Sequence, residues 1–264
     1  WRVRRNVHSR HCDLYRGDVG RNCRGTIWTL AGDRVIGIGL GLAIYISAHI
    51  SDAHLNPAVT LAFAIVRYRV FSWKKIPIYV TAQMLGGFFA AAIMYGFYHG
   101  AVESFEDNLG LERGSNGSER TAMIFGEYFP NPAAFVAEAF FIEAWGTAVL
   151  VFVIFSLTDS HNTTVGSGNN KVVVPILIGL TLSFLVSMYG PLTQGGYNPA
   201  RDFGPRLFAA LVGWGRIAIP GPRNGFWLYI IAPLIGGPIG GALHDLGVAN
   251  ITRLKRFVKP AKQF

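Results

Sequence analysis

Long stretches without a charged residue constrain this chain more than any other feature of its sequence. Four runs of 17 to 29 residues lack Asp, Glu, Lys and Arg entirely: 35–51, 76–102, 172–200 and 224–244. A fifth run, 133–157, is equally apolar but contains Glu138 and Glu143. A helix needs about 20 apolar residues, with roughly 17–25 tolerated, to cross the hydrocarbon core of a bilayer. The five runs therefore predict membrane-spanning helices in an integral membrane protein.

The composition supports a membrane protein and argues against other classes. Charged residues make up 15 % of the 264 residues, against roughly 25 % in a soluble domain. The net charge of +9 raises the question of a nucleic-acid partner, but the basic residues cluster at the ends of the apolar runs, so we expect none. We also expect no metal site, because both cysteines lie within the first 25 residues and the histidines His49, His99 and His244 are far apart.

Two further segments are too short to span a bilayer and mark an internal repeat. Segments 57–66 and 199–215 each begin with a proline directly after an asparagine, Asn56 or Asn198. Proline suits the first helical position because its missing N–H has no partner there. The asparagines lie 142 residues apart, and an odd number of spans separates them. This pattern predicts an inverted duplication with two re-entrant half-helices around a site near the membrane midplane.

The chain resembles the major intrinsic proteins, the aquaporins and aquaglyceroporins, through SDAHLNPAVTLA in one half and GGYNPARDFGPR in the other. The resemblance covers about residues 34–248. Asp202 directly after Arg201, and a loop ending IFGEYFPNPAAF, are similar to the glycerol facilitator branch. The resemblance implies an all-α membrane protein with an aquaporin-like inverted repeat of six spanning helices and two half-helices. It also implies a pore in each subunit, a homotetramer in the lipid bilayer, no enzymatic activity and no cofactor.

The resemblance assigns roles to individual residues. The two Asn-Pro-Ala pore boxes are Asn56, Pro57, Ala58, Asn198, Pro199 and Ala200. A ladder of backbone carbonyls leads to them from Asp52, Ala53, His54, Gln194, Gly195 and Gly196, with Asp52 in place of the family's usual glycine. The selectivity filter is Ile36, Val186, Gly195 and Arg201. Glu143 and Gln83 brace the box loops, although a simple interhelical hydrogen bond is an equally good interpretation of Gln83.

The expected filter is apolar on three sides and has one polar corner at Arg201. Neither the aromatic ring nor the histidine of water-selective members is present. The aromatic pair of the typical glycerol channel is missing as well, with Ile36 and Gly195 in those places. This favours glycerol or another small neutral solute, with water also permeating and protons and ions excluded. The alternatives are a water-selective aquaporin and a channel for urea, ammonia or metalloid acids. A structural ion pair is the alternative interpretation of Arg201, and we expect Arg206 to face the outer mouth.

Residues 1–25 depart from the family. They contain seven arginines and no apolar helix, so we expect that the first spanning helix is missing or replaced and that the sequence upstream of about residue 26 is truncated or misread. The channel domain is then 26–250, with halves 26–102 and 132–250, followed by a basic tail at 251–264. Basic residues at 67–75 and in this tail predict a cytoplasmic C-terminus, in a plasma or inner membrane.

Overall fold

The computed structural model describes residues 24–129, 135–162, 164–165 and 172–251. Within these ranges the regular structure is entirely helical. Five helices are long and apolar enough to cross a membrane, as the charge-free runs predict: α2 (Arg24–Ser51), α4 (Ile76–Leu109), α6 (Val136–Thr158), α7 (Val174–Thr193) and α9 (Leu228–Leu243). The basic N-terminal segment and tail lie almost entirely outside the described residues, and so does a third Asn-Pro-Ala triplet at 131–133.

The two expected half-helices are α3 (Pro57–Val66) and α8 (Pro199–Ala209). The second is shorter than the predicted 199–215, because the chain continues as a π turn, η3 (Ala210–Trp214), in which Gly213 has a φ of 116°. Four other short helices lie in the connections between longer ones: η1 (Trp73–Lys75), α5 (Glu119–Ala122), η4 (Gly215–Ile217) and η5 (Pro222–Asn224). A fifth, η6 (His244–Ala249), directly continues α9.

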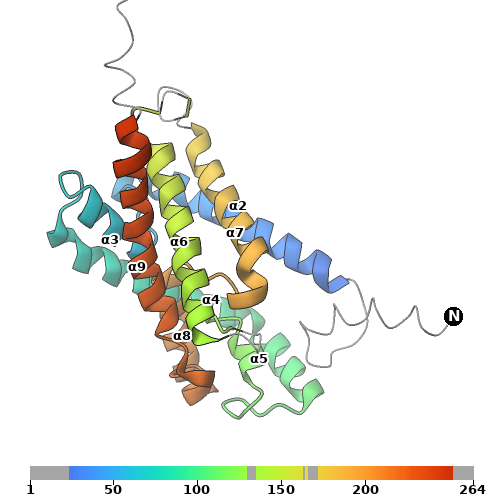
Figure 1. Cartoon of the computed structure of the whole chain (residues 1–264). Coiled ribbons are helices and arrows are strands. Elements are labelled where there is room, and N and C mark those ends of the chain that lie inside the picture. Colours follow the sequence, from blue (N-terminus) through green and yellow to red (C-terminus); the bar gives the residue numbers. More distant parts are fainter. Residues whose placement is uncertain (1–23, 130–134, 163, 166–171, 252–264) are drawn as a thin grey trace, which may run out of the picture.

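The two halves of the chain are intertwined. Helices α6 and α9 lie side by side, and α2 crosses α7 (Figure 1). Half-helix α3 of the first half packs against α9 of the second, whereas half-helix α8 packs against α4 of the first. Each half-helix is therefore held by the last long helix of the opposite half, which brings the two boxes together.

Glycines at the crossings explain part of the high glycine content. A Cβ built on Gly37 of α2 would lie 2.4 Å from the carbonyl oxygen of Gly179 in α7. A Cβ on Gly236 of α9 would lie 2.0 Å from the carbonyl oxygen of Ala144 in α6. The backbones approach so closely at these crossings that only glycine fits there, as is common between helices in lipid.

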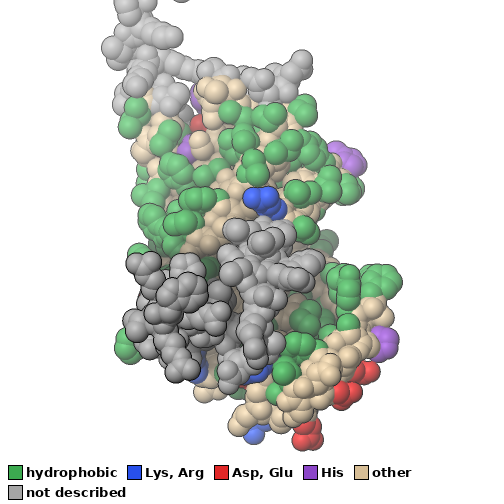
Figure 2. All heavy atoms as spheres, turned by 90° about the vertical axis from the view of Figure 1, so that its right-hand side faces the viewer, with side chains coloured by type: hydrophobic (Ala, Val, Ile, Leu, Met, Phe, Trp, Pro, Cys, Tyr) green, Lys and Arg blue, Asp and Glu red, His purple; other side chains and the backbone are tan. Residues whose placement is uncertain are grey.

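Apolar side chains cover much of the outer surface. Figure 2 shows hydrophobic side chains over the upper and middle parts of one face, and acidic side chains gathered at its lower end. Phe97 of α4 and Ile46 of α2 are 76 % and 69 % exposed. Large apolar side chains pointing outward from long helices are unfavourable in water and suit contact with lipid.

Candidate pore site

Each half-helix begins at an asparagine that caps its first turn. Asn56 Oδ1 accepts a hydrogen bond from the backbone N–H of Ala58 at 2.8 Å, and Asn198 Oδ1 accepts one from Ala200 at 3.0 Å. A proline occupies the first helical position of both half-helices, as expected. The other four box residues are buried: Pro57, Ala58, Pro199 and Ala200.

The two asparagines also connect the boxes to each other. Asn56 Nδ2 donates to the carbonyl of Tyr197 at 2.8 Å, and Asn198 Nδ2 donates to the carbonyl of Leu55 at 3.0 Å. The N-terminal ends of α3 and α8 therefore meet, and both direct the positive end of a helix dipole to the same point. Each amide nitrogen carries two hydrogens, so these bonds use one N–H of each.

A buried carboxylate holds the loop in front of the second box. Glu143 of α6 is fully buried and accepts hydrogen bonds from the Thr193 hydroxyl at 2.6 Å, Gly196 N at 3.1 Å and Tyr197 N at 2.8 Å. A charge in such surroundings is tolerated only when it is well hydrogen-bonded. These bonds fix the backbone that leads into Asn198.

Gln83 of α4 lies against the first box. Its Nε2 donates to the carbonyl of His54 at 2.5 Å and to the Thr60 hydroxyl at 3.0 Å. Of the two interpretations of Gln83, these contacts favour the brace. Among the described residues, His54 Nδ1 and Gln83 Oε1 are buried and have no hydrogen-bond partner.

Two of the three expected carbonyl-ladder residues in each loop have a left-handed backbone. The φ values are 53° at Asp52, 53° at Ala53, 67° at Gln194 and 71° at Gly195. Aspartate is enriched in this region relative to most other non-glycine residues, so Asp52 can adopt a conformation that suits the family's usual glycine. The carbonyl of His54 is already bonded to Gln83, and Gly196 is buried against Glu143.

The four expected filter residues come from α2, α7, the second box loop and α8. A Cβ built on Gly195 would lie 3.2 Å from Val186 Cγ2, so these two residues are neighbours. Val186 belongs to a buried apolar cluster, and Ile36 packs against that cluster. Arg201 follows the box on α8, and its side chain is 31 % exposed.

Sequence reasoning missed the partner of Arg201. Glu127 lies in the loop before α6, and its Oε1 accepts a hydrogen bond from Arg201 Nη1 in an ion pair. The only signal was that Glu127 is the sole charged residue between Arg120 and Glu138. The structure thus contains the ion pair that was the alternative interpretation of Arg201, and the role of Arg201 in a filter stays a prediction.

The expectation for Arg206 was wrong. Its side chain is 1 % exposed and pairs with Asp202, which is fully buried, at 2.6 Å. The pair lies one helical turn apart on α8, and Arg206 Nη1 also donates to the carbonyl of Ala218 at 2.9 Å. Its guanidinium lies over the ring of Tyr128, 4.6 Å from the centroid. Burial raises the pKa of the Tyr128 hydroxyl to about 12, so it stays protonated and donates to the carbonyl of Ile217.

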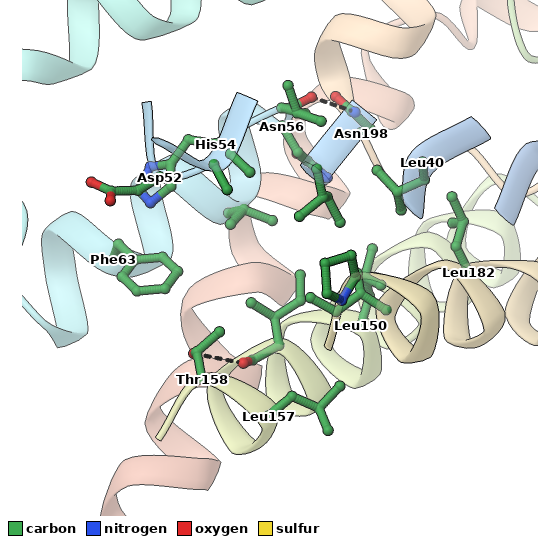
Figure 3. Close-up of a pocket in the computed structure, with 18 of the residues that line it drawn as sticks. Leu40, Asp52, His54, Asn56, Phe63, Leu150, Leu157, Thr158, Leu182 and Asn198 are labelled. Carbon is green, nitrogen blue, oxygen red and sulfur yellow. Dashed lines mark hydrogen bonds between the residues drawn. The ribbon is translucent and has the colours of Figure 1, made fainter. Parts of the chain in front are cut away.

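A cavity of about 660 Å³ reaches the meeting point of the two half-helices. In Figure 3, Asn56 and Asn198 lie next to each other, and Leu157 and Thr158 of α6 lie across the cavity from them. The wall is mostly apolar and includes Leu40, Leu150 and Leu182 from three different helices. Arg201 also lines it. The arrangement is an apolar passage that ends at paired amide groups and one guanidinium.

Comparisons with known proteins agree with this geometry. Aquaglyceroporin-2 of Rhizophagus irregularis is 44 % identical over 209 residues, which are 79 % of this chain and 63 % of that protein. The glycerol uptake facilitator protein of Pseudomonas aeruginosa is 43 % identical over 216 residues, 81 % of this chain and 75 % of that protein. The chain thus spans less than two thirds of the length of the Rhizophagus relative.

The fold is also that of a solved structure. The X-ray structure of the aquaglyceroporin from Plasmodium falciparum matches with a TM-score of 0.73 and 24 % identity, covering 92 % of this chain and 89 % of that one. Residues 23–244 match the family described as major intrinsic protein. With two capped half-helices joined at their N-termini inside a bundle of apolar helices, the chain belongs to the major intrinsic protein family.

Proposed function

We propose that this chain forms a passive transmembrane pore for small neutral solutes such as glycerol, with water also permeating and with protons and ions excluded. The observation that carries the proposal is the head-to-head meeting of α3 and α8 at Asn56 and Asn198, at the end of a largely apolar cavity. Two positive dipole ends at one point raise a barrier to cations and protons. The names of the relatives, glycerol uptake facilitator and aquaglyceroporin, support glycerol as the solute.

The proposed filter explains why a polyol suits this pore. Arg201 offers N–H donors to hydroxyl oxygens, whereas Ile36 and Val186 offer an apolar wall to the carbon backbone. The backbone carbonyls beside the boxes are the proposed acceptors for solute hydroxyls: Asp52, Ala53, His54, Gln194, Gly195 and Gly196. Glu143 and Gln83 are the proposed braces of these loops.

We further propose the arrangement of the chain in its membrane. The channel domain is residues 26–250, with halves 26–102 and 132–250, and it assembles as a homotetramer of channels without enzymatic activity. The end that carries Arg67, Arg69, Lys74 and Lys75 faces the cytoplasm, as does the basic tail, because positive residues are enriched on that side. The membrane is a plasma or inner membrane.

Stopped-flow light scattering of proteoliposomes in parallel gradients of glycerol, urea and sorbitol tests the proposal. We expect glycerol to enter far faster than in protein-free vesicles and faster than sorbitol, whose longer chain carries more hydroxyls past the apolar wall. Fast water flux without glycerol flux would show a water-selective pore instead. Glycerol entry at the rate of protein-free vesicles would overturn the proposed function.

A further inference from the structure

The positive potential where α3 and α8 meet attracts anions. The N-terminal ends of α3 and α8 both contribute positive potential, and Arg201 adds a full positive charge one turn away. Such a potential excludes cations but lowers the energy of a small anion in the passage. A compensating negative charge close to Arg201 would remove this attraction for anions and leave the exclusion of cations to the helix dipoles.

Glu127 is placed to supply that charge. Its carboxylate pairs with the Arg201 guanidinium, and its side chain is only 10 % exposed. Among the described residues, Asp202 and Arg206 are the nearest other charges on α8, but they neutralise each other as a fully buried pair. Glu143 points its carboxylate at the box loop and not at Arg201. The charge of Arg201 is thus balanced by Glu127.

The loop that carries Glu127 is clamped in place by the Asp202–Arg206 pair. Asp202 Oδ1 accepts a hydrogen bond from Glu127 N at 2.6 Å, and Arg206 Nη2 donates to the carbonyl of Glu127. The next residue is held as well, since Tyr128 N donates to Gln194 Oε1 at 2.5 Å. The N–H and the carbonyl of Glu127 are therefore both held, which fixes the backbone position from which its side chain reaches Arg201.

We propose that Glu127 is a specificity-determining residue of the filter, which cancels the charge of Arg201 and thereby excludes small anions from the pore. The inference rests on the proposed function, because it assumes that solutes pass Arg201. Asp202 and Arg206 are positioning residues, which act through the backbone of Glu127.

The size of the effect follows from the charge that is removed. A unit charge at about 6 Å from a permeating ion changes its occupancy about threefold at the dielectric constant of water and about a hundredfold at an effective value near 20. Removing the carboxylate should therefore raise anion permeability by at least about threefold. Glycerol carries no net charge, so its permeability should change far less.

The test compares Glu127→Gln, which keeps the size of the side chain, with Glu127→Asp, which keeps its charge. Glu112→Gln, an exposed carboxylate of the same loop, is the matched control. Each protein is reconstituted, and the flux of nitrate is measured in a potassium nitrate gradient with valinomycin, beside the flux of glycerol. We expect a nitrate leak in Glu127→Gln, little leak in Glu127→Asp and none in the parent or Glu112→Gln.

A double variant separates charge from structural damage. In Glu127→Gln combined with Arg201→Gln, both charges are absent, so the nitrate leak should disappear again, whereas damage from a misfolded loop would persist. A parent that conducts nitrate, equal leaks in the Gln and Asp variants, or a leak that survives in the double variant would each overturn the inference. If the parent carries glycerol but Glu127→Gln gains no nitrate flux, the inference fails alone. If the parent carries no glycerol, the proposed function fails with it.

Discussion

Replacing Glu143 by glutamine should loosen the loop in front of the second box. Gly196 N, Tyr197 N and the Thr193 hydroxyl all donate to the Glu143 carboxylate. Glutamine has one acceptor oxygen and one NH₂ donor, so in either orientation at least one buried backbone N–H faces a donor. Such a group costs about 1–3 kcal/mol, and loss of the charge weakens the remaining bonds by roughly 1 kcal/mol more. We expect the free energy of unfolding to fall by about 2–4 kcal/mol.

Thermal unfolding in detergent and glycerol flux in vesicles measure the two consequences of Glu143→Gln. The matched control is Glu138→Gln, which changes an exposed carboxylate in the first turn of the same helix and should leave both quantities near those of the parent. Glycerol flux should fall in Glu143→Gln, because Gly195 and Gly196 lose their fixed positions beside the filter. If the Glu143 and Glu138 variants unfold and conduct alike, the brace does not hold the box.

Two further sets of variants test the boxes and the helix packing. Asn56→Asp places a carboxylate oxygen against the carbonyl of Tyr197, and Asn198→Asp places one against the carbonyl of Leu55. In both variants neutral-solute flux should fall and a cation leak should appear. Unchanged glycerol flux in both variants at equal expression would count against the paired boxes. Gly37→Ala sets a methyl group 2.4 Å from Gly179 O, whereas Gly39→Ala on the same helix meets nothing within 4 Å. Thermal unfolding should therefore show that the free energy of unfolding is about 1–3 kcal/mol lower in Gly37→Ala and close to that of the parent in Gly39→Ala. Equal stabilities of the two variants would contradict the close crossing of α2 and α7.

The sequence predicted the features of this fold that depend on local patterns. Apolar runs are long enough to identify the five helices by themselves, and Asn-Pro at 56–57 and 198–199 marks a capped helix start in both halves. The hydrogen bonds of Glu143 were expected only from the family resemblance, because Glu138 lies in the same apolar run and the run alone does not distinguish the two carboxylates.

The features that sequence reasoning missed depend on contacts between distant segments. Glu127 and Arg201 are 74 positions apart, and nothing in the pattern around either residue predicts that the loop folds back over α8. Arg206 was expected near the mouth because arginines favour water, but Asp202 one turn earlier on α8 satisfies its charge in the interior. Buried ion pairs of this kind override the burial preference of each residue alone.

Chemical blocking at Val186 tests most directly whether solutes pass between the expected filter residues. Val186 is 6 % exposed and lies against Gly195, whereas Phe184, two residues earlier on α7, is 61 % exposed on the outer surface. With Cys12 and Cys23 replaced by serine, Val186→Cys and Phe184→Cys are each reconstituted, and glycerol flux is measured before and after treatment with a mercurial reagent. We predict that the reagent blocks glycerol flux through Val186→Cys and leaves Phe184→Cys unaffected. Full glycerol flux through a labelled Val186→Cys protein would contradict a pore at this position.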